Sequence, residues 1–194
     1  MGSHRMVTKQ VSFYEEMTNV PFIIAGPGIH PRQKPVEDLL TQPTIDLLPT
    51  LCELAGIPVP SSKPGISLAP FLKGEKQKRQ HPYAASEWHS EYEVTVSPGR
   101  MIRSPRYKYT HYLEGNGEEL YDMLKDKGER RNLAHDPKYS KILAEHRALL
   151  DDYIHRTQDD YRSLKVEADK RWRSHVPGYP NHEGPCARDI INRK

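Results

Sequence analysis

The sequence has only two cysteines and no long apolar run, and both absences limit what the chain can be. Cys52 falls in an apolar helical pattern and Cys186 in a stretch rich in proline and glycine, so no disulfide framework is implied. A membrane-spanning helix needs roughly 18 consecutive apolar residues, whereas the longest run here covers residues 20–25. We therefore expect a soluble chain without a membrane span. No signal peptide is evident, which leaves a cytoplasmic, periplasmic or secreted location open.

The chain also lacks a strong excess of one charge. Its 29 basic and 26 acidic residues leave a net charge of +3, and both signs are mixed along most of the sequence. Proteins that track phosphates usually concentrate lysine and arginine on one face, so nucleic acid is not expected as a partner. A hydrophobic fraction of 36% with 17 prolines is low for a self-sufficient domain. The 194 residues would suffice for one domain or for a piece of something larger.

The first half has the pattern of an α/β domain. The continuous apolar segment VPFIIAG, residues 20–26, is typical of a strand covered on both faces of a sheet. The segment TIDLLPTLCELAG, residues 44–56, has apolar residues on most sides of a helix, which predicts that this helix is buried. Asp46 is the expected N-cap, Pro49 is expected in the first turn, and Gly56 is expected to end the helix.

The second half has a different character, and the change of composition over residues 61–82 predicts a subdomain boundary. Residues 100–123 combine β-branched and aromatic residues with a Gly-Asn-Gly turn, a pattern that predicts antiparallel strands joined by a hairpin. Asp136 and Pro137 then mark the start of a long amphipathic helix. We expect the segment around Tyr107 to Tyr109 to lie at a sheet edge, and residues 159–194 to form an extended tail.

Four sequence blocks, in order and in spacing, resemble the C-terminal portion of the sulfatase family within the alkaline-phosphatase-like superfamily. They are GSHRMVTKQVSFYEEMTNVPFIIAGPGI, TIDLLPTLCELAGIPVP followed by GISLAPFLKG, RMIRSPRYKY, and ELYDMLKDKGERRNLA. The resemblance implies an α/β plus α+β fold. Residues 1–80 would be the last part of an alkaline-phosphatase-like α/β sandwich, and residues 81–158 a smaller subdomain with an antiparallel sheet and one long helix.

The resemblance implies a parent protein that hydrolyses sulfuric esters with a formylglycine residue and a divalent cation, Ca²⁺ or Mg²⁺. The family forms formylglycine within a C/S-x-P-x-R motif and holds the cation with motifs such as Asp-His-Gly or Asp-Asn-Gly. None of these motifs occurs in this chain. We therefore expect no metal ligands or nucleophile here, and no activity from the chain alone.

The resemblance assigns site residues by position. Lys9 matches the family lysine that contacts the sulfate or the leaving-group oxygen, although an exposed lysine near a chain end is the alternative. His4 matches a histidine five residues before that lysine, although the first four residues also resemble a cloning remnant. His89 lies where relatives often place substrate-recognition residues. Glu15 and Glu16 are expected to be structural.

Two other functions remain open at this level. The same blocks fit a phosphonate monoester or phosphodiester hydrolase of the superfamily, and the tail fits a non-catalytic assembly module. The expected partners are a sulfate ester of a carbohydrate or small organic molecule, and the remaining part of the sulfatase or a second copy of the chain. Self-association would follow if the apolar segment at residues 20–25 lacks the sheet that should cover it.

Overall fold

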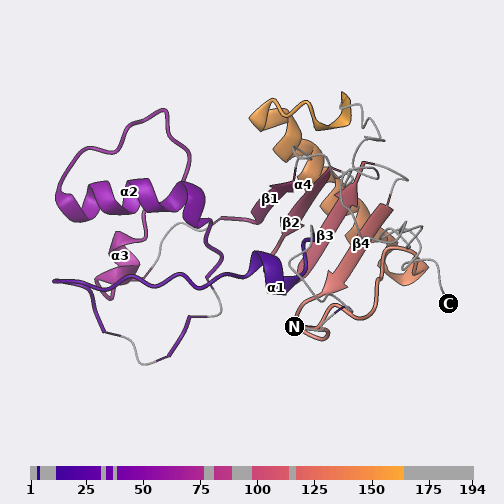
Figure 1. The fold of residues 1–194 in the computed structure, drawn as a ribbon, viewed down its shortest axis with the longest axis horizontal. Helices are drawn as coiled ribbons and strands as arrows, with labels where there is room; N and C mark the ends of the chain where they lie inside the picture. The colour runs from indigo at the N-terminus through magenta and orange to yellow at the C-terminus, as the bar shows by residue number, and fades with distance from the viewer. Residues whose placement is uncertain are drawn as a thin grey trace, which may run out of the picture.

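The computed structural model places the secondary structure in two groups (Figure 1). Helices α2 (Pro43–Ala55) and α3 (Ala69–Leu72) pack together, and a four-stranded sheet with helix α4 (Ser140–Thr157) forms the second group. The short helix α1 (Glu15–Thr18) lies beside the sheet. None of the helices among the described residues is long and apolar enough to cross a bilayer. The structure describes residues 4, 12–31, 34–36, 39–76, 81–88, 98–113 and 117–163.

The sheet is an antiparallel meander in which each strand pairs with the next one along the chain. Its strands are β1 (Ala84–Trp88), β2 (Gly99–Arg103), β3 (Tyr107–Tyr112) and β4 (Gly117–Asp122). The predicted antiparallel strands are therefore confirmed. Strand β3 lies inside the sheet, between β2 and β4, so the expectation of a sheet edge was wrong.

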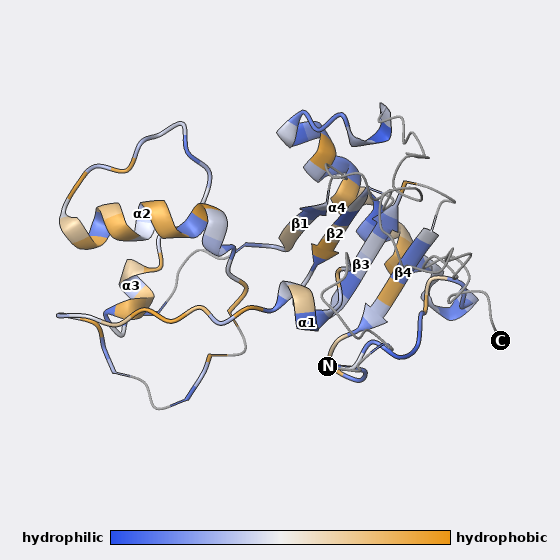
Figure 2. Ribbon diagram, viewed as in Figure 1, coloured by the Kyte–Doolittle hydropathy of each residue, from blue (hydrophilic) through white to orange (hydrophobic). Residues whose placement is uncertain are grey.

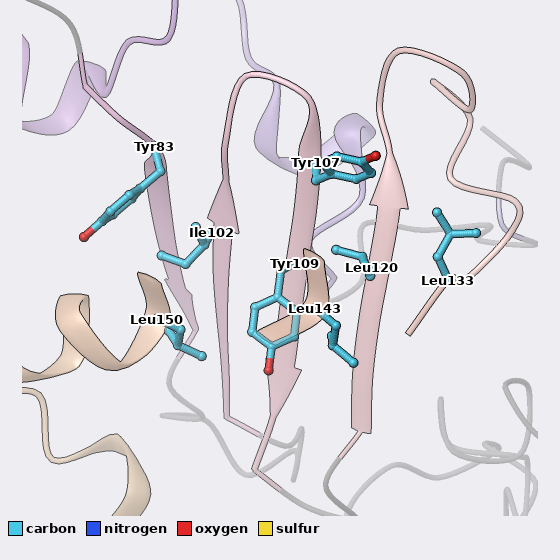
Figure 3. Packing of buried hydrophobic residues seen from close by; sticks show 8 residues of the cluster. All are labelled: Tyr83, Ile102, Tyr107, Tyr109, Leu120, Leu133, Leu143 and Leu150. Carbon is cyan, nitrogen blue, oxygen red and sulfur yellow. The ribbon is translucent and has the colours of Figure 1, made fainter. Parts of the chain in front are cut away.

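One face of the sheet forms the hydrophobic core with α4 (Figure 3). Alternation along the strands points Ile102, Tyr109 and Leu120 to this face, where Leu143 and Leu150 of α4 meet them. The predicted start of the helix is confirmed with one difference. Asp136 caps the turn by accepting a hydrogen bond from the backbone N–H of Lys138, but Pro137–Tyr139 forms a 3₁₀ turn before α4.

The other face of the sheet is covered by the N-terminal segment around α1. Met101, Lys108, Thr110, Glu119 and Tyr121 alternate with the core residues and are all buried. Phe13 is buried against Gly99 and the ring of Tyr112, with ring centroids 5.9 Å apart. A sheet with both faces covered explains why the charged side chains of Lys108 and Glu119 are buried.

Helix α2 differs from its prediction at its start and in its burial. It begins at Pro43, so Asp46 lies inside the first turns and is not the N-cap, and Pro49 lies within the helix. The end is as predicted, because Gly56 adopts the left-handed conformation with a φ of 70°. The expectation of burial was wrong for the described chain, since Leu47, Leu48 and Leu51 are all exposed.

The predicted strand at residues 20–25 forms no strand in the structure. The segment is extended, with Val20 and Ile23 exposed, and Figure 2 shows that it is largely apolar, as are helices α2 and α3. A strand requires a neighbour for its backbone N–H and C=O groups. The four strands among the described residues pair only with one another, which leaves this segment without one.

The first residues of the predicted tail pack against the sheet. The carboxylate of Asp159 accepts two hydrogen bonds from the Arg100 guanidinium, at 2.6 and 2.8 Å. Tyr161 is fully buried, and its hydroxyl donates to the backbone carbonyl of His111. Residues 159–163 are therefore ordered parts of the fold, and the rest of the predicted tail lies outside the described residues.

Candidate functional site

Of the three predicted site residues, the structure describes His4 alone. Its ring stacks on the ring of Tyr14, with centroids 3.6 Å apart and planes within 3° of parallel. Its Nε2 atom is buried and has no hydrogen-bond partner within the described residues. Lys9 and His89 lie outside the described residues, so their roles stay predictions.

The segment that carries Tyr14 is attached to the sheet by a buried lysine. Lys108 of β3 is 1% exposed, and its ammonium donates to the backbone carbonyl of Phe13 at 2.9 Å. The same ammonium lies 2.6 Å from Oε1 of Glu15 and 2.9 Å from Oε1 of Glu129. A weaker contact of 3.4 Å reaches Oγ1 of Thr18. Lys108 therefore contacts both ends of the segment 13–18.

Glu129 completes this attachment from the turn that follows β4. Its side chain is 2% exposed, and its Oε2 atom accepts a hydrogen bond of 2.7 Å from the backbone N–H of Glu15. Burial raises the pKa of the Glu129 carboxyl, and the nearby Lys108 ammonium partly opposes this. Residues 126–129 form a turn in which the backbone N–H of Glu129 donates to the carbonyl of Asp126 at 3.0 Å, and Glu129 ends it at a φ of 50° with its carboxylate on α1.

A second buried carboxyl lies on the same face of the sheet. Desolvation raises the pKa of Glu119 to about 7, and the charge of Glu129 adds to the shift while Lys108 opposes it. Burial, followed by the charge of Glu119, raises the pKa of Tyr14 to about 12. Tyr14 is therefore a neutral phenol at physiological pH, and its ring faces His4 without a charge of its own.

The ligand atoms of His4, Glu16 and Glu129 lie within 4.8 Å of one another, which is a spacing that could hold a metal ion. The donor set does not fit the Ca²⁺ or Mg²⁺ that the family resemblance implies. Such cations need about six to eight oxygen ligands for Ca²⁺ and an octahedral oxygen set for Mg²⁺. Glu129 is moreover already paired with the Lys108 ammonium, which would repel a cation. We therefore assign no metal to this cluster.

Neither Lys108 nor Glu129 was predicted from the sequence to belong to this region. A signal for Lys108 was present, because a lysine between Tyr107 and Tyr109 must point to the opposite face of a strand from the two aromatic rings. Glu129 gave no signal, since the backbone N–H of Glu15 that it binds lies 114 residues away in the sequence. The structural interpretation of Glu15 agrees with its ion pair to Lys108.

Comparisons with known proteins place the chain in a family. Residues 2–156 match the model of the family described as N-sulphoglucosamine sulphohydrolase, C-terminal. The chain is 76% identical over all 194 residues to a Delta 4,5-hexuronate-2-O-sulfatase of Bacteroides thetaiotaomicron and covers 40% of that protein. It is 34% identical over 140 residues to arylsulfatase K of Homo sapiens, covering 68% of this chain and 25% of that protein.

A solved structure gives the same result. The structure of a 2-O GAG sulfatase superposes with a TM-score of 0.84 at 77% identity, covering 97% of this chain and 41% of that chain. The chain thus spans about two fifths of the length of this structure and of the Bacteroides sulfatase. The predicted family and fold class are confirmed. The chain belongs to the N-sulphoglucosamine sulphohydrolase C-terminal family of sulfatases.

Proposed function

We propose that this chain forms part of the active site of a sulfatase that hydrolyses a sulfate ester of a carbohydrate to sulfate and an alcohol. The observation that carries the proposal is the 76% identity, over the whole chain, to a protein named for the 2-O-sulfate of a 4,5-unsaturated hexuronate. The proposed substrate is accordingly a 2-O-sulfated unsaturated uronic acid at the end of a carbohydrate chain.

In this proposal Lys9 and His4 face the sulfate ester. The ester oxygen gains negative charge as its bond to sulfur breaks, and a fixed ammonium in a desolvated pocket stabilises that charge. The Nε2 atom of His4 is buried and lacks a hydrogen-bond partner among the described residues, so its hydrogen-bonding capacity is unused within them. The stacking on Tyr14 supports this role because it sets the plane of the imidazole.

Formylglycine and the divalent cation would supply the nucleophile and the stabilisation of the sulfate group. The motifs that carry them in the family do not occur in this chain. We assign them to the part of the relatives' length that this chain does not match. On this assignment, the isolated chain releases no product from 4-nitrophenyl sulfate in the presence of Ca²⁺.

A chimera tests the proposal. This chain would replace the matching 40% of the Bacteroides thetaiotaomicron 2-O-sulfatase, and the purified chimera would be given an unsaturated disaccharide with or without a 2-O-sulfate. We expect release of inorganic sulfate from the sulfated disaccharide, measured by ion chromatography. A phosphonate monoester serves as the comparison substrate. Faster hydrolysis of the phosphonate, or a folded chimera that releases no sulfate, would contradict the proposal.

A further inference from the structure

We propose that Lys108 and Glu129 are positioning residues for the proposed sulfatase site. They form a buried clamp, defined here as these two side chains, that fixes the segment 13–18 on the sheet and through it the imidazole of His4. This inference rests on the proposed function, because it concerns the same site. Neither residue contacts the proposed substrate in this account.

The clamp holds the backbone on both sides of Tyr14. Before it, the carbonyl of Phe13 accepts a hydrogen bond from Lys108, and after it, the N–H of Glu15 donates to Glu129. The two bonds therefore flank a single residue. Tyr14 is the residue whose ring stacks at 3.6 Å on His4. A shift of the backbone at Tyr14 would carry the imidazole with it or break the stacking.

Because the clamp is buried, it allows only one position of the segment 13–18 on the sheet. Lys108 and Glu129 are 1% and 2% exposed, so water cannot replace the contacts that a shift would break. An unpaired charge at such a site is strongly unfavourable, whereas a paired one is tolerated. The side chain of Glu15 adds a third charged partner to the same ammonium. The segment 13–18 is thus restricted to the register in which all three charges are paired.

The clamp and the predicted site residues come from different halves of the sequence. Lys108 lies at the centre of the sheet and Glu129 in the turn after β4, both in the second half of the sequence. The predicted site residues Lys9 and His4 precede Phe13, the first residue of the clamped segment, by four and nine positions. The antiparallel sheet therefore acts as the rigid support for the segment 13–18, which belongs, by sequence, to the first half of the chain.

Hydrogen exchange on this chain tests the clamp itself. In Lys108→Met, we expect the amides of residues 13–18 to exchange at least tenfold faster than in the unmodified chain, with little change in β2 and β3. Glu129→Gln keeps an acceptor for the Glu15 N–H and should give a smaller increase. Lys125→Met, at an exposed lysine of the same turn region, is the control and should change nothing. Unchanged exchange at residues 13–18 in Lys108→Met would overturn the clamp.

Steady-state kinetics of the chimera test whether the clamp contributes to catalysis. For variants that circular dichroism shows to be folded, we expect Lys108→Met to lower kcat at least tenfold and to change KM less than threefold, since misplaced site residues weaken the transition state more than substrate binding. The variant that combines Lys108→Met with Glu129→Gln should lose less kcat than the product of the two single fold-losses, because it leaves fewer unpaired charges.

A merely structural role would lower stability and leave kcat unchanged, which would overturn the inference. An inactive unmodified chimera would overturn the proposed function and the catalytic part of this inference, while the exchange result on the clamp would stand.

Discussion

The imidazole Nε2 of His81 donates a hydrogen bond of 2.7 Å to Oδ1 of Asp46, and this contact joins α2 to the segment that leads into β1. Asp46 is fully buried. Its carboxylate also accepts from the backbone N–H of Ile66 at 2.8 Å and of Gln42 at 2.7 Å. One carboxylate thus connects the start of α2, the segment before α3 and the approach to the sheet.

We expect Asp46→Ala to lower the free energy of unfolding by about 3 kcal/mol or more, because it leaves the buried N–H of Ile66, the partly buried N–H of Gln42 and an imidazole without an acceptor. Chemical denaturation followed by circular dichroism measures the change. Glu53→Ala, at an exposed position of the same helix, is the matched control and should shift stability by no more than about 0.5 kcal/mol. Equal stability of the two variants would contradict the structural role of Asp46.

Glu119 should make stability depend on pH near neutrality. Its pKa rises from 4.5 to about 7 on folding, so between these values the folded chain keeps a proton that the unfolded chain has released. Stability should therefore be greatest below the unfolded pKa, fall as pH rises through this window, and level off above it. The fall attributable to Glu119 is at most about 3 kcal/mol.

Urea denaturation between pH 5 and 8 checks this dependence, with Glu119→Gln as the variant that removes the titrating group. We expect the variant to be more stable than the unmodified chain at pH 8 and to gain less stability on acidification. Glu75→Gln, at an exposed glutamate, should reproduce the unmodified pH profile. Parallel profiles for the unmodified chain and Glu119→Gln would show that Glu119 does not cause the dependence.

Gly99 should tolerate no side chain, because Phe13 occupies the space next to it. A Cβ atom at this position would lie 2.6 Å from Cε2 of Phe13 and 3.1 Å from Cδ1 of Tyr112. We expect Gly99→Ala to destabilise the fold by about 1–3 kcal/mol through overpacking. Thermal unfolding measures the loss, and a second change, Phe13→Leu, should recover part of it. Gly117→Ala, where the nearest atom would lie at 3.7 Å, is the control in the same sheet.

The exposed leucines of α2 should make the isolated chain self-associate. Leu48 and Leu51 are 44% and 51% exposed, and large apolar side chains exposed together on one helix favour association. We expect light scattering to show a mass above that of one chain, and Leu48→Gln with Leu51→Gln to lower it. Leu124→Gln, at an exposed leucine of the other group, should leave the mass unchanged. A monodisperse, single-chain mass for the unmodified protein would contradict this prediction.

The parts of the fold that sequence could predict are those fixed by local pattern. The antiparallel pair β3–β4, the Asp136 cap and the end of α2 at Gly56 each depend on residues close in the sequence. The burial of α2 and a strand at residues 20–25 each require a neighbouring element, and the described residues do not supply one, so periodicity alone gave the wrong outcome for this chain. The clamp was not predictable for a related reason. Lys108 and Glu129 are ordinary surface residue types, and only the antiparallel pairing of β3 with β4 brings them to α1.

The proposed function depends most on contact between Lys9 and the sulfate ester, and activity of the chimera measures this contact directly. We expect Lys9→Ala to lower kcat/KM for the 2-O-sulfated disaccharide by about 10²–10³-fold, the loss that follows removal of one group that stabilises developing negative charge. Lys34→Ala, at an exposed lysine, is the control and should retain full activity. A kcat/KM for Lys9→Ala equal to that of the control would contradict the account.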